Sequence, residues 1–183
     1  MTSPSKTLDD VRNVGLLNVP NGSFLITGRP RMRSAWLAGL MSFAYTIYHE
    51  APLAAKPIQS DVPFGLIDPG AACLYPIKAM SEFLGQRIVI IERHAKDARK
   101  SLERLVGQQV THWDELEKRY QFFKRESDAL VVPFEHLTDF ETVFALVEYC
   151  TGAQLSRQHF DLFDGLRIEQ DFKKAQQREA SAA

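Results

Sequence analysis

The fold is decided by residues 23–36, SFLITGRPRMRSAW, which predict a strand, then a tight turn with three arginines, then the start of a helix. Residues 23–27 are largely apolar and compatible with a strand, Gly28 and Pro30 mark a turn, and Ser34 can cap the helix. Backbone N–H groups at the start of a helix, next to the positive end of its dipole, form an anion site. Because the arginines add full positive charges, this stretch predicts a phosphate-binding loop.

The rest of the chain alternates between predicted strands and helices. Short apolar runs predict strands at 64–67, 87–92 and 129–132. Apolar residues at helical spacing predict helices at 34–48, 76–84, 95–106, 111–127, 138–149 and a short one from 156. This order predicts an α/β fold: a single P-loop-type domain with a mainly parallel sheet of four to five strands flanked by helices. We expect the domain to span residues 21–170, between a peripheral N-terminal segment, 1–20, and a frayed C-terminal tail, 171–183.

Composition argues against several classes of function. The chain has 183 residues and a formal net charge of -1, whereas general nucleic-acid binding relies on a basic surface. No stretch approaches the ~20 apolar residues of a membrane span, and residues 1–13 lack the pattern of a signal peptide. We therefore expect a soluble, cytoplasmic protein with no nucleic-acid or membrane partner. Cys73 and Cys150 have neither metal-ligand nor CxxC spacing, so we expect no metal site and two buried core cysteines.

The phosphate loop departs from the one that binds nucleoside triphosphates. That loop follows G-x-x-x-x-G-K-[ST], where the lysine reaches the β/γ-phosphates and the hydroxyl holds Mg²⁺. Counted from Gly28, the three closing positions hold Arg33, Ser34 and Ala35. The lysine is missing and an alanine replaces the Mg²⁺ hydroxyl, which weakens a kinase or GTPase hypothesis.

The same segment, GRPRMRSAWL (28–37), resembles the 5′-phosphosulfate loop of P-loop sulfotransferases, whose pattern is roughly G-x-P-[KR]-S-G-T-T-W-L. The matching residues are Pro30, Arg31, Ser34, Trp36 and Leu37, and the departures are Met32 for Ser, Arg33 for Gly and Ala35 for the second Thr. The resemblance implies that the loop binds the donor 3′-phosphoadenosine 5′-phosphosulfate (PAPS) through Arg29, Arg31, Met32, Arg33, Ser34, Ala35 and Trp36. It implies that Trp36 stacks on adenine, and core packing of this indole is the alternative.

A second segment, RIVIIERHAKDARKSLERL (87–105), resembles the 3′-phosphate-binding segment of the same family. There a hydrophobic strand ends in Arg and a Ser follows eight residues later on the next helix, as Arg93 and Ser101 do here. The two side chains can converge on one phosphate, one with charge and the other with a hydroxyl donor. A third segment, LVVPFEHL (130–137), resembles the family's v-x-Y-E-D-L segment, and the resemblance spans about residues 23–152 in family order.

The resemblance implies sulfuryl transfer from PAPS to a hydroxyl or amine of a small-molecule or glycan acceptor, without a metal. A general base must reach the acceptor, and the candidates are Glu50, His49 and Asp68. Glu50 is favoured because glycan-modifying and bacterial sulfotransferases often carry a catalytic Glu after the loop helix. Two alternatives stay open: a diverged nucleotide or small-molecule kinase, and a catalytically silent P-loop domain that binds an anionic ligand or a partner protein.

Overall fold

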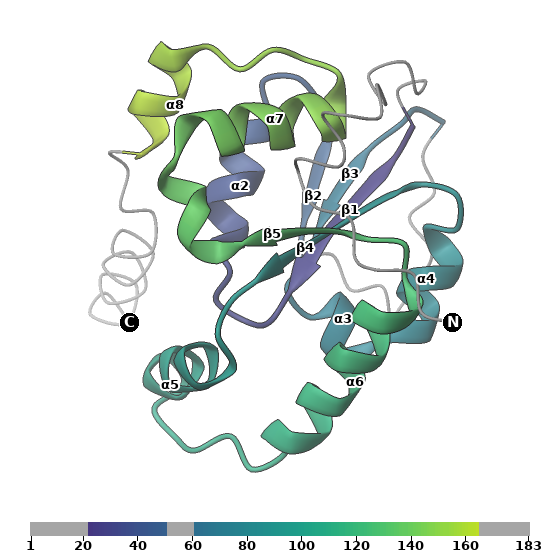
Figure 1. Ribbon diagram of the computed structural model, residues 1–183, viewed down its shortest axis with the longest axis vertical. Helices are drawn as coiled ribbons and strands as arrows, with labels where there is room; N and C mark the ends of the chain where they lie inside the picture. The colour runs from purple at the N-terminus through teal and green to yellow at the C-terminus, as the bar shows by residue number, and fades with distance from the viewer. Residues whose placement is uncertain (1–21, 51–60, 165–183) are drawn as a thin grey trace, which may run out of the picture.

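Within residues 22–50 and 61–164, which the computed structural model describes, five parallel strands form one sheet of order β2-β3-β1-β4-β5 (Figure 1). The strands are β1 (Phe24–Gly28), β2 (Ile47–His49), β3 (Gly65–Ile67), β4 (Arg87–Glu92) and β5 (Leu130–Pro133). Leu25 of the central strand β1 lies opposite Leu66 of β3 and Ile88 of β4. Every residue of β1 is buried, and a strand covered on both faces accounts for its mostly apolar sequence, in which Thr27 is the polar residue.

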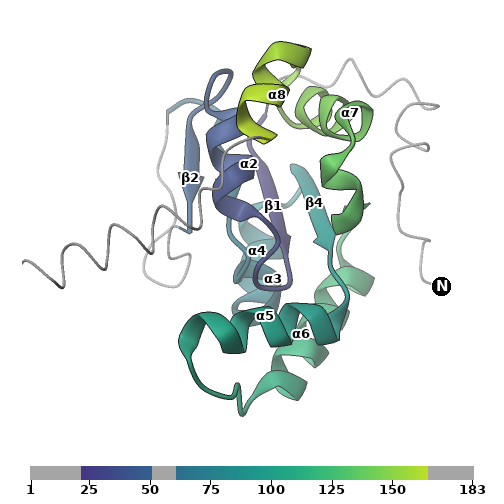
Figure 2. The same ribbon diagram turned by 90° about the vertical axis from the view of Figure 1, so that its left-hand side faces the viewer.

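Helices cover both faces of the sheet (Figures 1 and 2). Their bounds are α2 (Ser34–Met41), α3 (Ala71–Leu74), α4 (Pro76–Glu82), α5 (Ala95–Val106), α6 (Trp113–Glu126), the 3₁₀ helix η2 (Phe134–Thr138), α7 (Phe140–Thr151) and α8 (Arg157–Asp164). Ile26 and its neighbours on one face pack against α2, α7 and α8. Leu25 and its neighbours on the other face pack against α3, α4 and α6, as the two-residue alternation of a strand requires.

Helix α5 lies apart from these two layers, beyond the carboxyl ends of β1 and β4 (Figure 1). Ala98 is its buried residue, and its polar side chains fill most of the remaining surface. An element with so little core contact at the ligand-binding edge of a parallel sheet is placed to contact a ligand.

The predicted fold class, a single α/β domain with a parallel sheet of four to five strands flanked by helices, is confirmed. The predicted helix at 34–48 is wrong in its second half, because α2 ends at Met41 and residues 47–49 form β2. The N–H of Gly65 donates to Thr46 and that of Glu50 to Ile67, which ties this segment to β3. A short apolar run with β-branched and aromatic residues suits a strand as well as a helix, so periodicity alone did not separate them.

Smaller features agree with the sequence. Asp139 caps α7 by accepting a hydrogen bond from the Thr142 N–H, and Gly152 ends this helix with a left-handed φ of 71°. Cys73 and Cys150 are both buried, as expected. The N-terminal segment 1–20 and the tail 171–183 lie outside the described residues. Within the described part of the chain, every helix is too short or too polar to span a bilayer.

Candidate functional site

The loop between β1 and α2 lies at the topological switch point of the sheet. The strands that follow β1 in sequence lie on both sides of it, with β3 on one side and β4 on the other. Ligands of open parallel sheets bind at such a point, at the carboxyl ends of the strands. A Cβ on Gly28 would lie 2.4 Å from the carbonyl oxygen of Ile91, so only glycine lets the loop start this close to β4. Arg31 and Arg33 both adopt left-handed backbone, with φ of 70° and 64°.

This backbone shape bends the loop tightly into the first turn of α2, where Arg33 is the N-cap residue. Arg33 therefore adopts the conformation for which the sulfotransferase pattern uses glycine, at a cost of about 1–2 kcal/mol. The first-turn N–H groups of a helix have no intrahelical acceptors, so they can donate to an anion. The loop thus keeps the backbone features of a phosphate cradle without the expected glycine.

The guanidinium of Arg29, which was expected to bind the cofactor, is engaged by other residues of the protein. Its guanidinium donates to both carboxylate oxygens of Glu117 on α6, at 2.8 and 2.5 Å, and to the carbonyl of Arg93 at 2.8 Å. It also lies 4.0 Å above the ring of Tyr120, and the residue is 5% exposed. These hydrogen bonds lower the pKa of Glu117 below its ordinary value. Arg29 is therefore a buried anchor of the loop.

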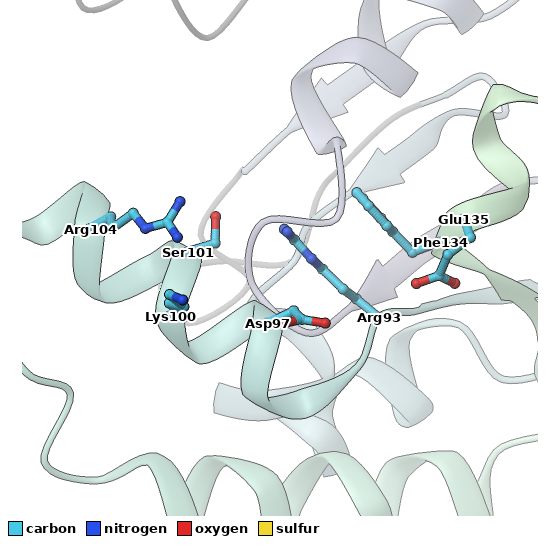
Figure 3. A pocket seen from close by; sticks show the side chains of 7 residues that line it. All are labelled: Arg93, Asp97, Lys100, Ser101, Arg104, Phe134 and Glu135. Atoms are coloured by element: carbon cyan, nitrogen blue, oxygen red, sulfur yellow. The ribbon is translucent and has the colours of Figure 1, made fainter.

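Arg93 and Ser101 do come together, and Arg31 joins them. The Arg93 guanidinium donates to the carbonyl of Arg31 at 2.5 Å, and the Arg31 Nε donates to the Ser101 hydroxyl at 3.4 Å. A pocket of about 280 Å³ opens here (Figure 3), lined by Arg93, Asp97, Lys100, Ser101, Arg104, Phe134 and Glu135. The strand end and the helix that follows it therefore present a guanidinium and a hydroxyl to one cavity.

Sequence reasoning gave no site role to five residues of this pocket: Asp97, Lys100, Arg104, Phe134 and Glu135. Lys100 and Arg104 were not singled out, although they lie on α5 beside Ser101. Phe134 places its ring 4.5 Å from the Arg93 guanidinium, and Glu135 follows it on η2. The helical spacing of Lys100 and Arg104 relative to Ser101 places the three on one face of α5, and this spacing could have predicted that they line the same pocket.

Two of the three candidate bases, His49 and Glu50, lie beside Ser34, and both interact electrostatically with the third, Asp68. The His49 Nε2 lies 3.1 Å from the Ser34 hydroxyl, and that hydroxyl donates to Glu50 at 3.4 Å. Glu50 has a left-handed φ of 52° and a side chain 57% exposed, 3.4 Å from His49. Asp68, in contrast, is buried and accepts a hydrogen bond from the Gly70 N–H at 2.7 Å. Burial, with a smaller contribution from the Glu50 carboxylate, raises the pKa of Asp68.

Trp36 lies in the core, which corrects the expectation that it stacks on adenine. Its residue is 4% exposed and its indole N–H donates to the carbonyl of Phe163 at 2.9 Å. The guanidinium of Arg33 covers the ring at 4.2 Å. Met32 is also fully buried, so its side chain cannot contact a ligand, and Ala35 is half-buried on α2.

Comparisons with known proteins do not identify a family. No family model matches the chain, and no curated protein matches it. Among solved structures, the chain is similar to a gluconokinase from Sinorhizobium meliloti 1021, with 12% identity and a TM-score of 0.40. That match covers 78% of this chain and 96% of the gluconokinase chain. Similarity at this level assigns no substrate to the chain.

Proposed function

We propose that this chain is a P-loop transferase that moves a sulfuryl group from PAPS to a hydroxyl or amine of a small-molecule or glycan acceptor. The observation that carries the proposal is the convergence of Arg31, Arg93 and Ser101 beside a pocket next to the phosphate loop. A guanidinium and a hydroxyl at one cavity suit a phosphate monoester, such as the 3′-phosphate of this donor.

The loop itself would hold the 5′-phosphosulfate. The donors there would be the backbone N–H groups of the loop and of the start of α2, which can bind an anion without the missing lysine. The acceptor oxygen bonds to sulfur while the bond from sulfur to the bridging phosphate oxygen breaks. The electron pair stays on that phosphate oxygen, where the loop donors stabilise the growing negative charge.

The acceptor loses a proton during the transfer, so a general base must lie within reach of it. Glu50 suits this role best, because its carboxylate is largely exposed and lies beside Ser34 at the start of α2. His49 is its neighbour and can share the proton. Asp68 remains the alternative base, and its raised pKa brings it nearer to neutral pH, but burial restricts its access to an acceptor.

Calorimetry with adenosine 3′,5′-bisphosphate, the desulfated donor, tests the proposal. We expect binding without Mg²⁺ and a loss of at least tenfold, or ~1.4 kcal/mol, in Arg93→Ala. Ser101→Ala, which removes only a hydroxyl, should weaken binding by a smaller factor. The matched control is Arg99→Ala on α5, because Arg99 pairs with Glu103 at 3.0 Å and lies outside the pocket lining. Wild-type protein that binds no bisphosphate, or equal losses in Arg93→Ala and Arg99→Ala, would contradict the proposal.

A kinase is the second candidate, and the position of Asp68 favours it. P-loop kinases hold Mg²⁺ between a loop hydroxyl and an aspartate at the end of a neighbouring strand. Asp68 directly follows β3, the neighbour of β1, and would supply the aspartate, whereas Ala35 stands at the position of the loop hydroxyl. Binding of ATP that requires Mg²⁺ and fails in Asp68→Asn would support this candidate. Bisphosphate binding without sulfuryl transfer to a broad panel of acceptors would instead indicate a catalytically silent domain.

A further inference from the structure

One face of α5 forms a wall of the pocket. Asp97, Lys100, Ser101 and Arg104 follow the spacing i, i+3, i+4 and i+7, which places them on the same side of a helix, and all four line the pocket. The adjoining apolar side of α5 contributes the buried Ala98. Four polar side chains of α5 are therefore available to a ligand in the pocket.

Charge is distributed unevenly in this pocket. Figure 3 shows Lys100, Ser101 and Arg104 together at one end, and the carboxylates of Asp97 and Glu135 nearer to the base of Arg93 and to Phe134. Two carboxylates at one end disfavour a long polyanion that would fill the whole pocket. The cationic end suits a compact group of high negative charge.

A phosphate monoester is such a group, since it carries about −1.5 to −2 charges at pH 7. Arg93, whose guanidinium already donates to the Arg31 carbonyl, brings a single positive charge from the strand side. Lys100 and Arg104 are exposed, and neither forms an ion pair with another described residue. Both can therefore turn to a ligand without breaking an existing pair.

We propose that Lys100 and Arg104 are specificity-determining residues, which select a nucleotide with a phosphate dianion at the 3′ end over the same nucleotide without it. This inference rests on the proposed function and deepens it. Arg93 and Ser101 together bring one positive charge, which does not balance a phosphate dianion. Lys100 and Arg104 supply the further positive charge. They lie one turn of α5 apart and flank Ser101, so they approach the same phosphate from the helix side.

The test is calorimetry with adenosine 3′,5′-bisphosphate and, by displacement, adenosine 5′-monophosphate, which lacks the 3′-phosphate. Each of Lys100→Ala and Arg104→Ala should weaken bisphosphate binding up to about fivefold, the range for exposed charges. The double variant should lose more than tenfold for the bisphosphate and less than twofold for the monophosphate. Its bisphosphate affinity should also depend less on salt, because fewer exposed charges contribute.

Two controls separate this role from a general change of surface charge. Lys96→Ala removes an exposed cation of α5 outside the pocket lining and should leave both affinities within twofold. Glu135→Gln removes a carboxylate from the pocket and should tighten bisphosphate binding or leave it unchanged. A double variant that keeps wild-type discrimination between the two nucleotides would overturn the inference alone. Wild-type protein that binds no bisphosphate would overturn the proposed function as well.

Discussion

Replacing Glu117 by alanine should destabilise the fold through the phosphate loop. The carboxylate of Glu117 accepts two hydrogen bonds from Arg29, whose residue is 5% exposed, while the Glu117 side chain is 25% exposed. Removing one partner of a buried pair leaves the other charge without compensation, at a cost of about 3–5 kcal/mol. Because Glu117 is partly exposed and Arg29 keeps its bond to the Arg93 carbonyl, we expect the low end, about 3 kcal/mol.

The measurement is urea unfolding, with the free energy of unfolding compared between wild type and variant. A loss of about 3 kcal/mol corresponds to a decrease in Tm of about 6–12 °C for a chain of this size. Glu115→Ala is the matched control, because Glu115 lies on the same helix and pairs with Arg119 at the surface. An exposed pair of this kind contributes about 0.2–1 kcal/mol. Similar losses in the two variants would refute a special role for the Arg29–Glu117 pair.

The same pair predicts a pH dependence. Its hydrogen bonds lower the pKa of Glu117 in the folded state, so the pair stabilises the fold above the unfolded pKa of about 4.3. This stabilisation is lost as the pH falls through the lowered pKa of the folded state. The difference in unfolding free energy between wild type and Glu117→Ala should therefore be constant from pH 7 to about 5 and shrink below about 4. A difference that persists unchanged at pH 3 would contradict the ion-pair explanation.

Two further substitutions test the surroundings of the loop. The hydroxyl of Tyr120 is buried with no hydrogen-bond partner among the described residues, so Tyr120→Phe should raise the unfolding free energy, by up to about 1 kcal/mol, in urea unfolding. The left-handed φ of Arg33 strains any residue with a Cβ. Arg33→Gly should therefore be more stable than Arg33→Ala by about 1 kcal/mol in thermal unfolding. The comparison is matched, because both variants lose the contacts of Arg33 with Leu137 and Asp164. Equal stability of the two Arg33 variants would show that the loop relaxes its backbone.

The sheet and the strand-turn-helix arrangement of β1 and α2 were predictable because their sequence signals are local. An unbroken apolar run such as 87–92 indicates a strand buried on both faces, and it forms β4. The spacing of Arg93 and Ser101 predicted that the two side chains lie close together, and both line one pocket at the end of β4 and on α5. Whether they bind a phosphate stays a prediction. The strand β2 escaped prediction, since its three residues extend a run that equally suits a helix.

Side-chain direction was the part that sequence could not supply. Arg29 and Arg31 are separated by one residue, yet Arg29 turns to Glu117 on α6 and Arg31 to Ser101 on α5. The partner of Arg29 lies 88 positions away in the chain, so no local pattern announces it. Lys100 and Arg104 had a local signal in their helical spacing, but charged residues on a helix surface are usually only solvated.

A single contact connects the Arg33 departure from the sulfotransferase pattern with the buried position of Trp36. Arg33 replaces the expected glycine and keeps its left-handed backbone, and its guanidinium lies over the Trp36 ring. Trp36, which the resemblance assigns to adenine, lies in the core beneath this cation. The cost of the strained backbone is offset by this contact and by the bonds of Arg33 to Leu137 and Asp164. Under the proposed function, a nucleotide is therefore held here by its phosphates, through the loop and the α5 face, rather than by stacking of its base on Trp36.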